Sequence, residues 1–216
     1  MEHTDIQAVV TAPKSRRAFL TGSAAAAGLL AIAATGGSTR SAQAASLSRS
    51  LGLHEASDAD ILNFALTLEH LEAEFYKQVV DSGVLTSYSL GVITTLRDHE
   101  IAHVDFLTQA LTDAGANPVE KLDSYNFDAL GDLSTEAGVL TASEALEETG
   151  VGAYTGAAQY LDNKDYLDAA GSIEQVEARH HGAIRWLNDK NPAPDVLGIV
   201  LTEAEVLDRI APIVGG

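Results

Sequence analysis

The sequence contains no cysteine among its 216 residues. Disulfide bonds, thiolate metal ligands, iron–sulfur clusters and cysteine nucleophiles are therefore excluded. Basic residues are also scarce, because 13 lysines and arginines stand against 31 aspartates and glutamates and leave a net charge of −18. Such an acidic chain is a poor ligand for nucleic acid or anionic membrane surfaces, and it attracts cations. Any bound metal ion must be held by histidine nitrogens and carboxylate oxygens.

The first 44 residues differ in charge from the rest of the chain. They carry a net charge of +2, so the remainder carries −20. The adjacent Arg16 and Arg17 precede an Ala- and Gly-rich apolar run that ends near Ala34, and residues 42–44 (Ala-Gln-Ala) are typical of a signal-peptide cleavage site. The apolar run is too weakly hydrophobic for a good membrane span. We therefore predict that residues 1–44 are a twin-arginine signal peptide and that the mature protein, without a stable span, is periplasmic or extracellular.

After a predicted linker, apolar residues recur with the spacing of a helix, and no strand-type alternation of useful length is present. The stretch from about 116 to 140 is irregular and is predicted to be a long crossover between the second and third helices. The fold class is thus all-α, a four-helix bundle. The predicted organisation is a linker over 45–56, a bundle over 57–190 with helices at 57–80, 87–114, 141–161 and about 166–187, and a C-terminal extension over 191–216 with a short helix at 195–210.

Residues 99–103, His-Glu-Ile-Ala-His, can be interpreted in two ways. As H-E-x-x-H they are typical of a zinc protease, with two histidines on the metal and the glutamate as general base. That site needs a third protein ligand, and Phe106 and Gln109 stand where the extended protease motif has glycine and histidine. As Glu100-x-x-His103, the same residues would form one part of a two-metal carboxylate site inside a helical bundle.

An internal repeat favours the two-metal interpretation. In each half of the chain a glutamate on an inward-facing helical stripe is followed by a tyrosine seven residues later and by a Glu-x-x-His motif about thirty residues later. The protease interpretation leaves the second half unexplained. The repeated residues are Glu69, Tyr76, Glu100 and His103 in the first half, and Glu147, Tyr154, Glu177 and His180 in the second.

The charges of this set point to divalent cations. Four carboxylates in one buried cavity would repel one another and raise one another's pKa values, so that some would be protonated. Two divalent ions would supply four positive charges and leave the carboxylates ionised. Neutral imidazole and carboxylate oxygen suit iron and manganese, and also zinc.

The chain from about 57 to 187 resembles the ferritin-like di-iron carboxylate proteins, a superfamily that includes desiccation-related and exported bacterial proteins. The segments LEHLEAEFY (68–76) and ALEETGV (145–151) carry the resemblance together with the two Glu-x-x-His motifs. It implies a ferritin-like bundle that holds two iron ions, or manganese or a mixed pair. It also implies that Tyr76 and Tyr154 lie close to the metals, just outside the ligands. The implied ligands are Glu69, Glu100, His103, Glu147, Glu177 and His180.

Two of these ligand positions stay open at the level of sequence. Glu72 lies one turn after Glu69, and Glu148 is adjacent to Glu147. The seven-residue spacing to tyrosine favours Glu69 and Glu147. His99 has no counterpart in the second half, so we expect it on the flank of its helix or just outside the ligands.

The expected function is oxidation of Fe(II) by O2 or peroxide, a ferroxidase- or peroxidase-type reaction in protection from oxidative or desiccation stress. Metal ions and O2 or peroxide are the expected partners. Whether the chain is an enzyme stays open, because the metal could instead staple the helices together or be stored as iron in a homo-oligomer. A manganese catalase-like activity and the zinc protease are further alternatives.

Overall fold

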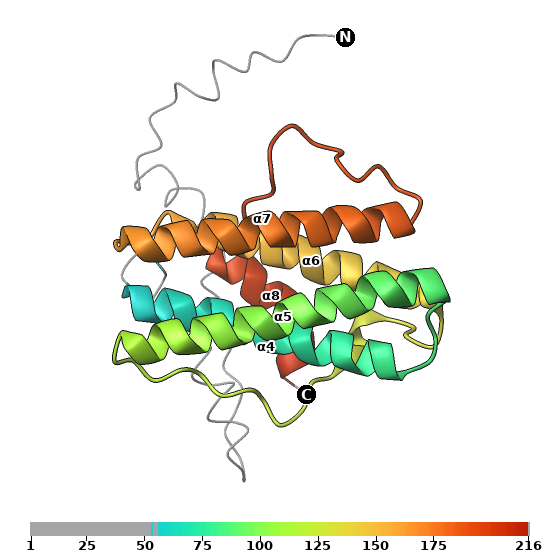
Figure 1. Ribbon diagram of the computed structural model, residues 1–216, viewed down its shortest axis with the longest axis horizontal. Coiled ribbons are helices and arrows are strands. Elements are labelled where there is room, and N and C mark those ends of the chain that lie inside the picture. The colour runs from blue at the N-terminus through green and yellow to red at the C-terminus, as the bar shows by residue number, and fades with distance from the viewer. Residues whose placement is uncertain (1–52, 54–55, 216) are drawn as a thin grey trace. The chain divides into compact units, whose positions relative to one another are not determined.

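The computed structural model describes Leu53 and residues 56–215, and the described residues form five α-helices and no strand (Figure 1). This confirms the predicted all-α fold. The predicted signal peptide, and nearly all of the predicted linker, lie outside the described residues. The helices are α4 (Asp58–Asp81), α5 (Ser87–Asp113), α6 (Glu136–Ala158), α7 (Lys164–Leu187) and α8 (Glu203–Val214), with a short 3-10 helix, η1 (Phe127–Leu130).

Short joints make two helical hairpins, in which α4 packs along α5 and α6 packs along α7. Helix α4 begins with a capping box. The Ser57 hydroxyl accepts a hydrogen bond from the Asp60 amide (3.3 Å), and the Asp60 carboxylate accepts one from the Ser57 amide (2.9 Å). The two bonds satisfy amides that the first turn of a helix leaves unpaired. The N-cap of helix α7 is Asn163, whose side chain accepts from the Asp165 amide.

The chain between α5 and α6 runs back along the length of the bundle, as predicted for a crossover (Figure 1). It contains η1, in which Phe127 is buried with its ring 5.3 Å from that of Phe75 on α4. The amide of Asn126 donates a 2.8 Å hydrogen bond to the carbonyl of Ile213 on α8. The crossover is therefore anchored to the bundle at its middle.

Helix α6 begins at Glu136, five residues before the predicted start at Thr141. The true N-cap is Thr135, whose hydroxyl accepts from the amide of Gly138 at 3.1 Å. The Thr141 hydroxyl donates to the Ala137 carbonyl one turn earlier, inside the helix. The prediction was wrong because a Thr-x-x-Glu pattern that resembles a capping box also occurs in a helix interior.

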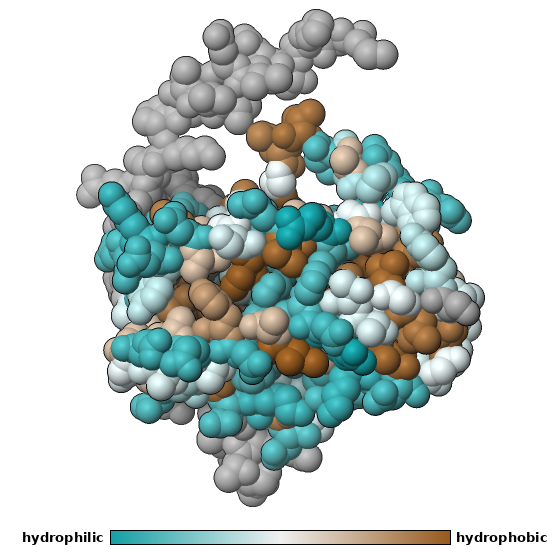
Figure 2. All heavy atoms as spheres, in the orientation of Figure 1, coloured by the Kyte–Doolittle hydropathy of each residue, from teal (hydrophilic) through white to brown (hydrophobic). Residues whose placement is uncertain are grey.

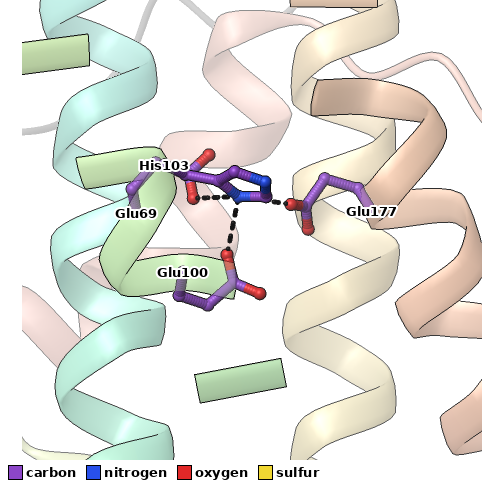
Figure 3. Close-up of side chains that lie close together, drawn as sticks. All are labelled: Glu69, Glu100, His103 and Glu177. Carbon is purple, nitrogen blue, oxygen red and sulfur yellow. Dashed lines mark hydrogen bonds and ion pairs between the residues drawn. The ribbon is translucent and has the colours of Figure 1, made fainter. Parts of the chain in front are cut away.

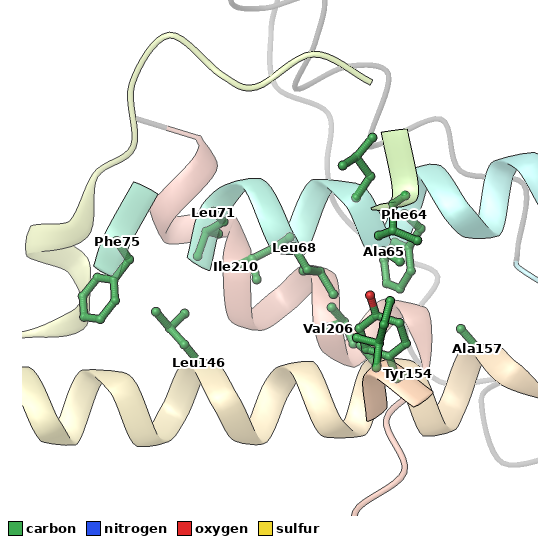
Figure 4. Packing of buried hydrophobic residues seen from close by; sticks show 14 of the residues in the cluster. Phe64, Ala65, Leu68, Leu71, Phe75, Leu146, Tyr154, Ala157, Val206 and Ile210 are labelled. Carbon is green, nitrogen blue, oxygen red and sulfur yellow. The ribbon is translucent and has the colours of Figure 1, made fainter. Parts of the chain in front are cut away.

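The predicted C-terminal helix is present as α8, but it begins at Glu203 rather than near residue 195. Its start is fixed by a capping box between Thr202 and Glu205. Helix α8 lies over α4 and α6, and its Val206 and Ile210 contribute to the buried core (Figure 4). One side of the bundle is thus closed by a fifth helix.

Two glycines of α6 allow the chain that leads into α8 to lie directly on the helix. The Leu201 amide donates a 3.0 Å hydrogen bond to the Gly152 carbonyl. A Cβ atom at Gly156 would lie 1.8 Å from the Leu201 carbonyl oxygen, and one at Gly152 would lie 2.5 Å from Leu201 Cγ. The low helix propensity of these glycines is therefore compensated by close packing.

Replacing Gly156 by alanine should destabilise the protein by about 1–3 kcal/mol, because the overlap with Leu201 outweighs the gain in helix propensity. Gly171 on α7 is a matched control, since a Cβ there would meet no atom of the described residues within 4 Å. Gly171→Ala should stabilise the protein by up to about 1 kcal/mol. Urea denaturation monitored by circular dichroism measures both changes, and equal effects of the two substitutions would contradict the packing argument.

Candidate metal centre

The six predicted ligands meet inside the bundle, where the inward stripes of four helices face one another. Glu69 comes from α4, Glu147 from α6, and α5 and α7 each contribute a Glu-x-x-His pair. The four carboxylates are completely buried, and the two imidazoles are at most 9% exposed. The helical spacing of three residues places each glutamate and its histidine on the same face. The sequence therefore identified a set of residues that the fold brings together.

His103 lies at the centre of one half of the cluster (Figure 3). Its Nδ1 atom is 3.1 Å from Glu100 Oε2 on the same helix. The same atom is 3.2 Å from Glu69 Oε2 and 3.1 Å from Glu177 Oε1, which come from α4 and α7. One ring nitrogen can donate only one hydrogen at a time. A single hydrogen bond therefore cannot account for all three carboxylate oxygens around this nitrogen.

His180 occupies the corresponding place in the other half. Its Nδ1 atom is 2.9 Å from Glu100 Oε1 and 3.5 Å from Glu147 Oε2. The more distant Glu177 Oε2 is 3.8 Å away. Glu100 and Glu177 thus face both histidines. Two overlapping sets have ligand atoms within 4.8 Å of one another and could each hold a metal ion: Glu69, Glu100, His103 and Glu177, and Glu100, Glu147, Glu177 and His180.

Several of these buried atoms lie close together without being hydrogen-bonded. Glu100 Oε1 and His180 Nδ1 are near one another, yet the directional requirement of a hydrogen bond is not met, and neither atom forms a hydrogen bond with any other described residue. Such an atom costs about 1–3 kcal/mol or more when it is buried without a partner. Buried charges are normally paired or coordinate metals. A metal ion, which accepts lone pairs from oxygen and nitrogen, would therefore suit the atoms of the cluster that form no hydrogen bond. These atoms are Glu72 Oε2, Glu100 Oε1, Glu147 Oε2, both Glu177 oxygens and His180 Nδ1.

The titration behaviour of the cluster is consistent with this interpretation. Burial raises the pKa of Glu100 to about 7, although the neighbouring imidazoles of His103 and His180 act to lower it. Burial and the charge of Glu100 raise the pKa of Glu177 well above its ordinary value. Burial alone would lower the pKa of each histidine, but the carboxylates around them raise the pKa of His103 to about 12 and that of His180 to about 10. Protons thus neutralise the metal-free cluster, and incoming metal ions must displace them.

The two repeated tyrosines bind carboxylates of the opposite half. The Tyr76 hydroxyl of α4 donates a 2.5 Å hydrogen bond to Glu147 Oε1 of α6. The Tyr154 hydroxyl of α6 donates to Glu69 Oε1 of α4. Burial raises the pKa of both phenols, and the charge of the carboxylate partner adds to the shift. The tyrosines therefore stay protonated, and from outside the cluster they hold Glu147 and Glu69 in place.

The structure distinguishes among the neighbouring carboxylates that the sequence left open. Glu148 points away and pairs with Arg209 of α8 at 2.9 Å, so Glu147 is the member of the cluster. Glu72 does not replace Glu69 in the cluster, because both carboxylates are buried there. Only 3% of Glu72 is exposed, and the nearby charge of Glu177 adds to the effect of burial in raising its pKa well above the ordinary value. The position of Glu72 on the inward stripe was the signal of its place in the cluster.

His99 lies at the outer edge of the cluster and belongs to neither set that could hold a metal ion. Its Nδ1 atom is 2.8 Å from His180 Nε2, and the two rings are nearly parallel. The two histidines of the H-E-x-x-H motif therefore do not belong to the same ligand set. Sequence reasoning could not find the contact with His180, because the two residues are 81 positions apart and His99 has no repeated counterpart.

The surface over α5 and α7 is mixed in character, with apolar side chains between hydrophilic ones (Figure 2). Exposed apolar residues on these helices include Ile101, Phe106 and Trp186. Among the described helices, none has an apolar stretch long enough to cross a lipid bilayer.

An antiparallel bundle with a buried carboxylate and histidine cluster, two helical hairpins and a long crossover defines the ferritin-like class of helical proteins. The family model described as a ferritin-like domain matches residues 57–190, more than half of the chain. The chain therefore belongs to the ferritin-like domain family. No curated protein matches it.

Proposed function

We propose that the buried cluster binds two iron ions and that the protein oxidises Fe(II) with O2 or peroxide. The observation that carries this proposal is the pair of overlapping ligand sets that share Glu100 and Glu177. A carboxylate with one oxygen toward each histidine is suited to bridge two ions. Carboxylate and imidazole ligands suit iron and manganese, and the residues of both sets are buried.

The bound ions would supply one-electron chemistry toward dioxygen. Each Fe(II) gives up one electron, so two Fe(II) reduce one O2 to H2O2, or one H2O2 to two molecules of water, with two protons taken from solvent. The chain's own residues bind the iron and exclude bulk water from it. Tyr76 orients the carboxylate of Glu147, and Tyr154 orients that of Glu69, through their hydrogen bonds.

The test is an oxygen-electrode measurement in which Fe(II) is added to metal-free protein under air. We expect oxidation faster than in buffer, with about two Fe(II) consumed per O2 if peroxide is the product. Glu177→Gln should oxidise Fe(II) at the rate of buffer alone. Glu148→Gln is the matched control, because Glu148 lies outside the cluster and pairs with Arg209.

A wild-type rate equal to that of buffer, with two ions bound, would reject the oxidase and favour a structural role. One observation supports this second candidate: ligands come from α4, α5, α6 and α7, so bound ions would cross-link all four helices of the bundle. Uptake of many more than two ions per chain would instead indicate storage. Oxygen release from peroxide by the manganese-loaded protein would identify a catalase-like activity.

We also propose that the protein acts outside the cytoplasm, in defence against oxidative or desiccation stress. The location outside the cytoplasm is inferred from Arg16-Arg17 and from the cleavage-site pattern at 42–44. The role in stress defence is inferred from the proposed consumption of Fe(II) and peroxide. Mature protein isolated from outside the cytoplasm should begin at Ala45 on N-terminal sequencing. Replacing both arginines by lysine should retain the full-length chain in the cytoplasm, and export that is unaffected by this change would contradict the proposal.

A further inference from the structure

Among the differences between the two halves of the internal repeat, two concern side chains that contact the cluster. When Glu69 is aligned with Glu147, Glu72 falls on Gly150. When the two Glu-x-x-His motifs are aligned, His99 falls on Val176. The first half therefore carries a carboxylate and an imidazole that the second half lacks. A perfectly repeated site would provide two metal positions with the same ligands and the same affinity. These two differences make the surroundings of the two positions unequal.

The carboxylate of Glu72 lies against α6 at Gly150, where the absence of a side chain leaves room beside it. A Cβ atom at Gly150 would lie 3.3 Å from Glu177 Oε2, 3.4 Å from Glu72 Oε1 and 3.6 Å from Glu72 Oε2. Three carboxylate oxygens thus surround one point, and Glu72 Oε2 has no hydrogen-bond partner among the described residues. An acidic side chain in this position needs a cation or a proton.

This extra carboxylate lies on the His180 side of the cluster. The two oxygens of Glu177 face different histidines, because Oε1 is 3.1 Å from His103 Nδ1 and Oε2 is 3.8 Å from His180 Nδ1. A Cβ atom at Gly150 would be 3.3 Å from Glu177 Oε2 and 3.4 Å from Glu72 Oε1, which places Glu72 on the Oε2 side of Glu177. Glu72 therefore adds negative charge to the set that contains Glu147 and His180, and less to the set around His103.

His99 acts on the same side. The Nδ1 atom of His180 faces the carboxylates, which leaves its Nε2–H to donate to His99 Nδ1 at 2.8 Å. A hydrogen bond of this kind fixes the tautomer and orientation of a metal-binding histidine and makes it a better ligand.

From these contacts we infer that the two metal positions are unequal, and that the position formed by Glu72, Glu100, Glu147, Glu177 and His180 binds its ion first and more tightly. His99 is a positioning residue for it, and Glu72 is an additional ligand. The inference rests on the proposed binding of two ions. It does not require the oxidase reaction.

The test is an anaerobic titration of metal-free full-length protein with Mn²⁺, followed by calorimetry and by competition with a chromophoric chelator. Wild-type protein should bind two ions in two resolved steps. His103→Ala should keep the tight step, and His180→Ala should lose it. Glu72→Gln and His99→Ala should each weaken the tight step by about tenfold or more.

Two further variants separate ligation from general effects. Gly150→Ala would crowd the carboxylates of Glu72 and Glu177 and should weaken the tight step while leaving the fold intact by circular dichroism. Asp81→Asn removes one charge from the exposed end of α4 and should leave both steps unchanged.

Two equal binding steps in wild-type protein would overturn the inference. An unchanged tight step in Glu72→Gln, or loss of the tight step in His103→Ala but not in His180→Ala, would also overturn it. Each of these results leaves the proposed binding of two ions standing. Wild-type protein that binds no Mn²⁺ or Fe(II) would instead reject the proposed function.

Discussion

Replacing Glu177 by glutamine should abolish tight binding of both metal ions. Glu177 belongs to both ligand sets and contacts His103 and His180 through different oxygens. Glutamine keeps the size of the side chain but removes its charge and one carboxylate oxygen. Changes outside the ligand set typically cost 10–100-fold in metal affinity, so loss of a shared ligand should cost more than about 100-fold. Equilibrium dialysis with elemental analysis should show fewer than one bound ion, against about two in the wild type.

The matched control is Glu148→Gln, the same substitution at the adjacent glutamate that the sequence left as an alternative to Glu147. The Glu148 carboxylate pairs with Arg209 on the surface and should not affect metal binding. Removing a buried negative charge should not unfold Glu177→Gln, which circular dichroism can verify. Two tightly bound ions in a folded Glu177→Gln protein would show that the cluster is not the metal site.

Metal binding should stabilise the fold strongly, and the effect should increase with pH. A ligand at about a thousand times its dissociation constant adds roughly 4 kcal/mol to the free energy of unfolding. For a chain of this size that corresponds to a rise in Tm on the order of 10 °C. The physical source is the cluster of buried carboxylates, which the metal ions neutralise.

The pH dependence follows from Glu100, whose pKa rises from 4.5 to about 7 on folding of the metal-free protein. Between pH 4.5 and about pH 7, Glu100 holds a proton in the folded state that it has lost in the unfolded state. The stability of the metal-free protein therefore falls as pH rises through this range. Metal binding needs deprotonated ligands and strengthens over the same interval. Differential scanning calorimetry should therefore find a larger metal-induced rise in Tm at pH 8 than at pH 5.5. A rise that is independent of pH, or equally large in Glu177→Gln, would contradict this account.

The fold could be predicted largely from the sequence, because helical periodicity and turn residues act locally. The two hairpins and the crossover follow from apolar stripes and from the irregular stretch between them. The errors lie at helix starts, where local signals compete. Thr141 has the pattern of a cap, but Thr135 is the residue whose side chain meets a free amide. The packing of Leu201 on Gly152 and Gly156 could not be predicted, since the contact joins segments about fifty residues apart.

The candidate ligands could also be predicted, because charged residues on inward-facing stripes and a repeated spacing can be recognised in the sequence alone. A stripe shows which side of a helix faces inward, but it does not show which residue lies opposite. The sequence therefore placed Tyr76 and Tyr154 near the site without revealing that each binds the glutamate of the other half. The fifth carboxylate and the contact of His99 with His180 depend on the same three-dimensional arrangement.

The central claim is that the cluster between His103 and His180 holds two metal ions. The most direct test is anomalous scattering measured at the iron absorption edge, from crystals of protein loaded anaerobically with Fe(II). The account predicts two iron peaks inside the bundle, with His103 Nδ1 on one and His180 Nδ1 on the other, and with Glu100 and Glu177 reaching both. Iron found only at surface carboxylates, with no peak in the cluster, would contradict it.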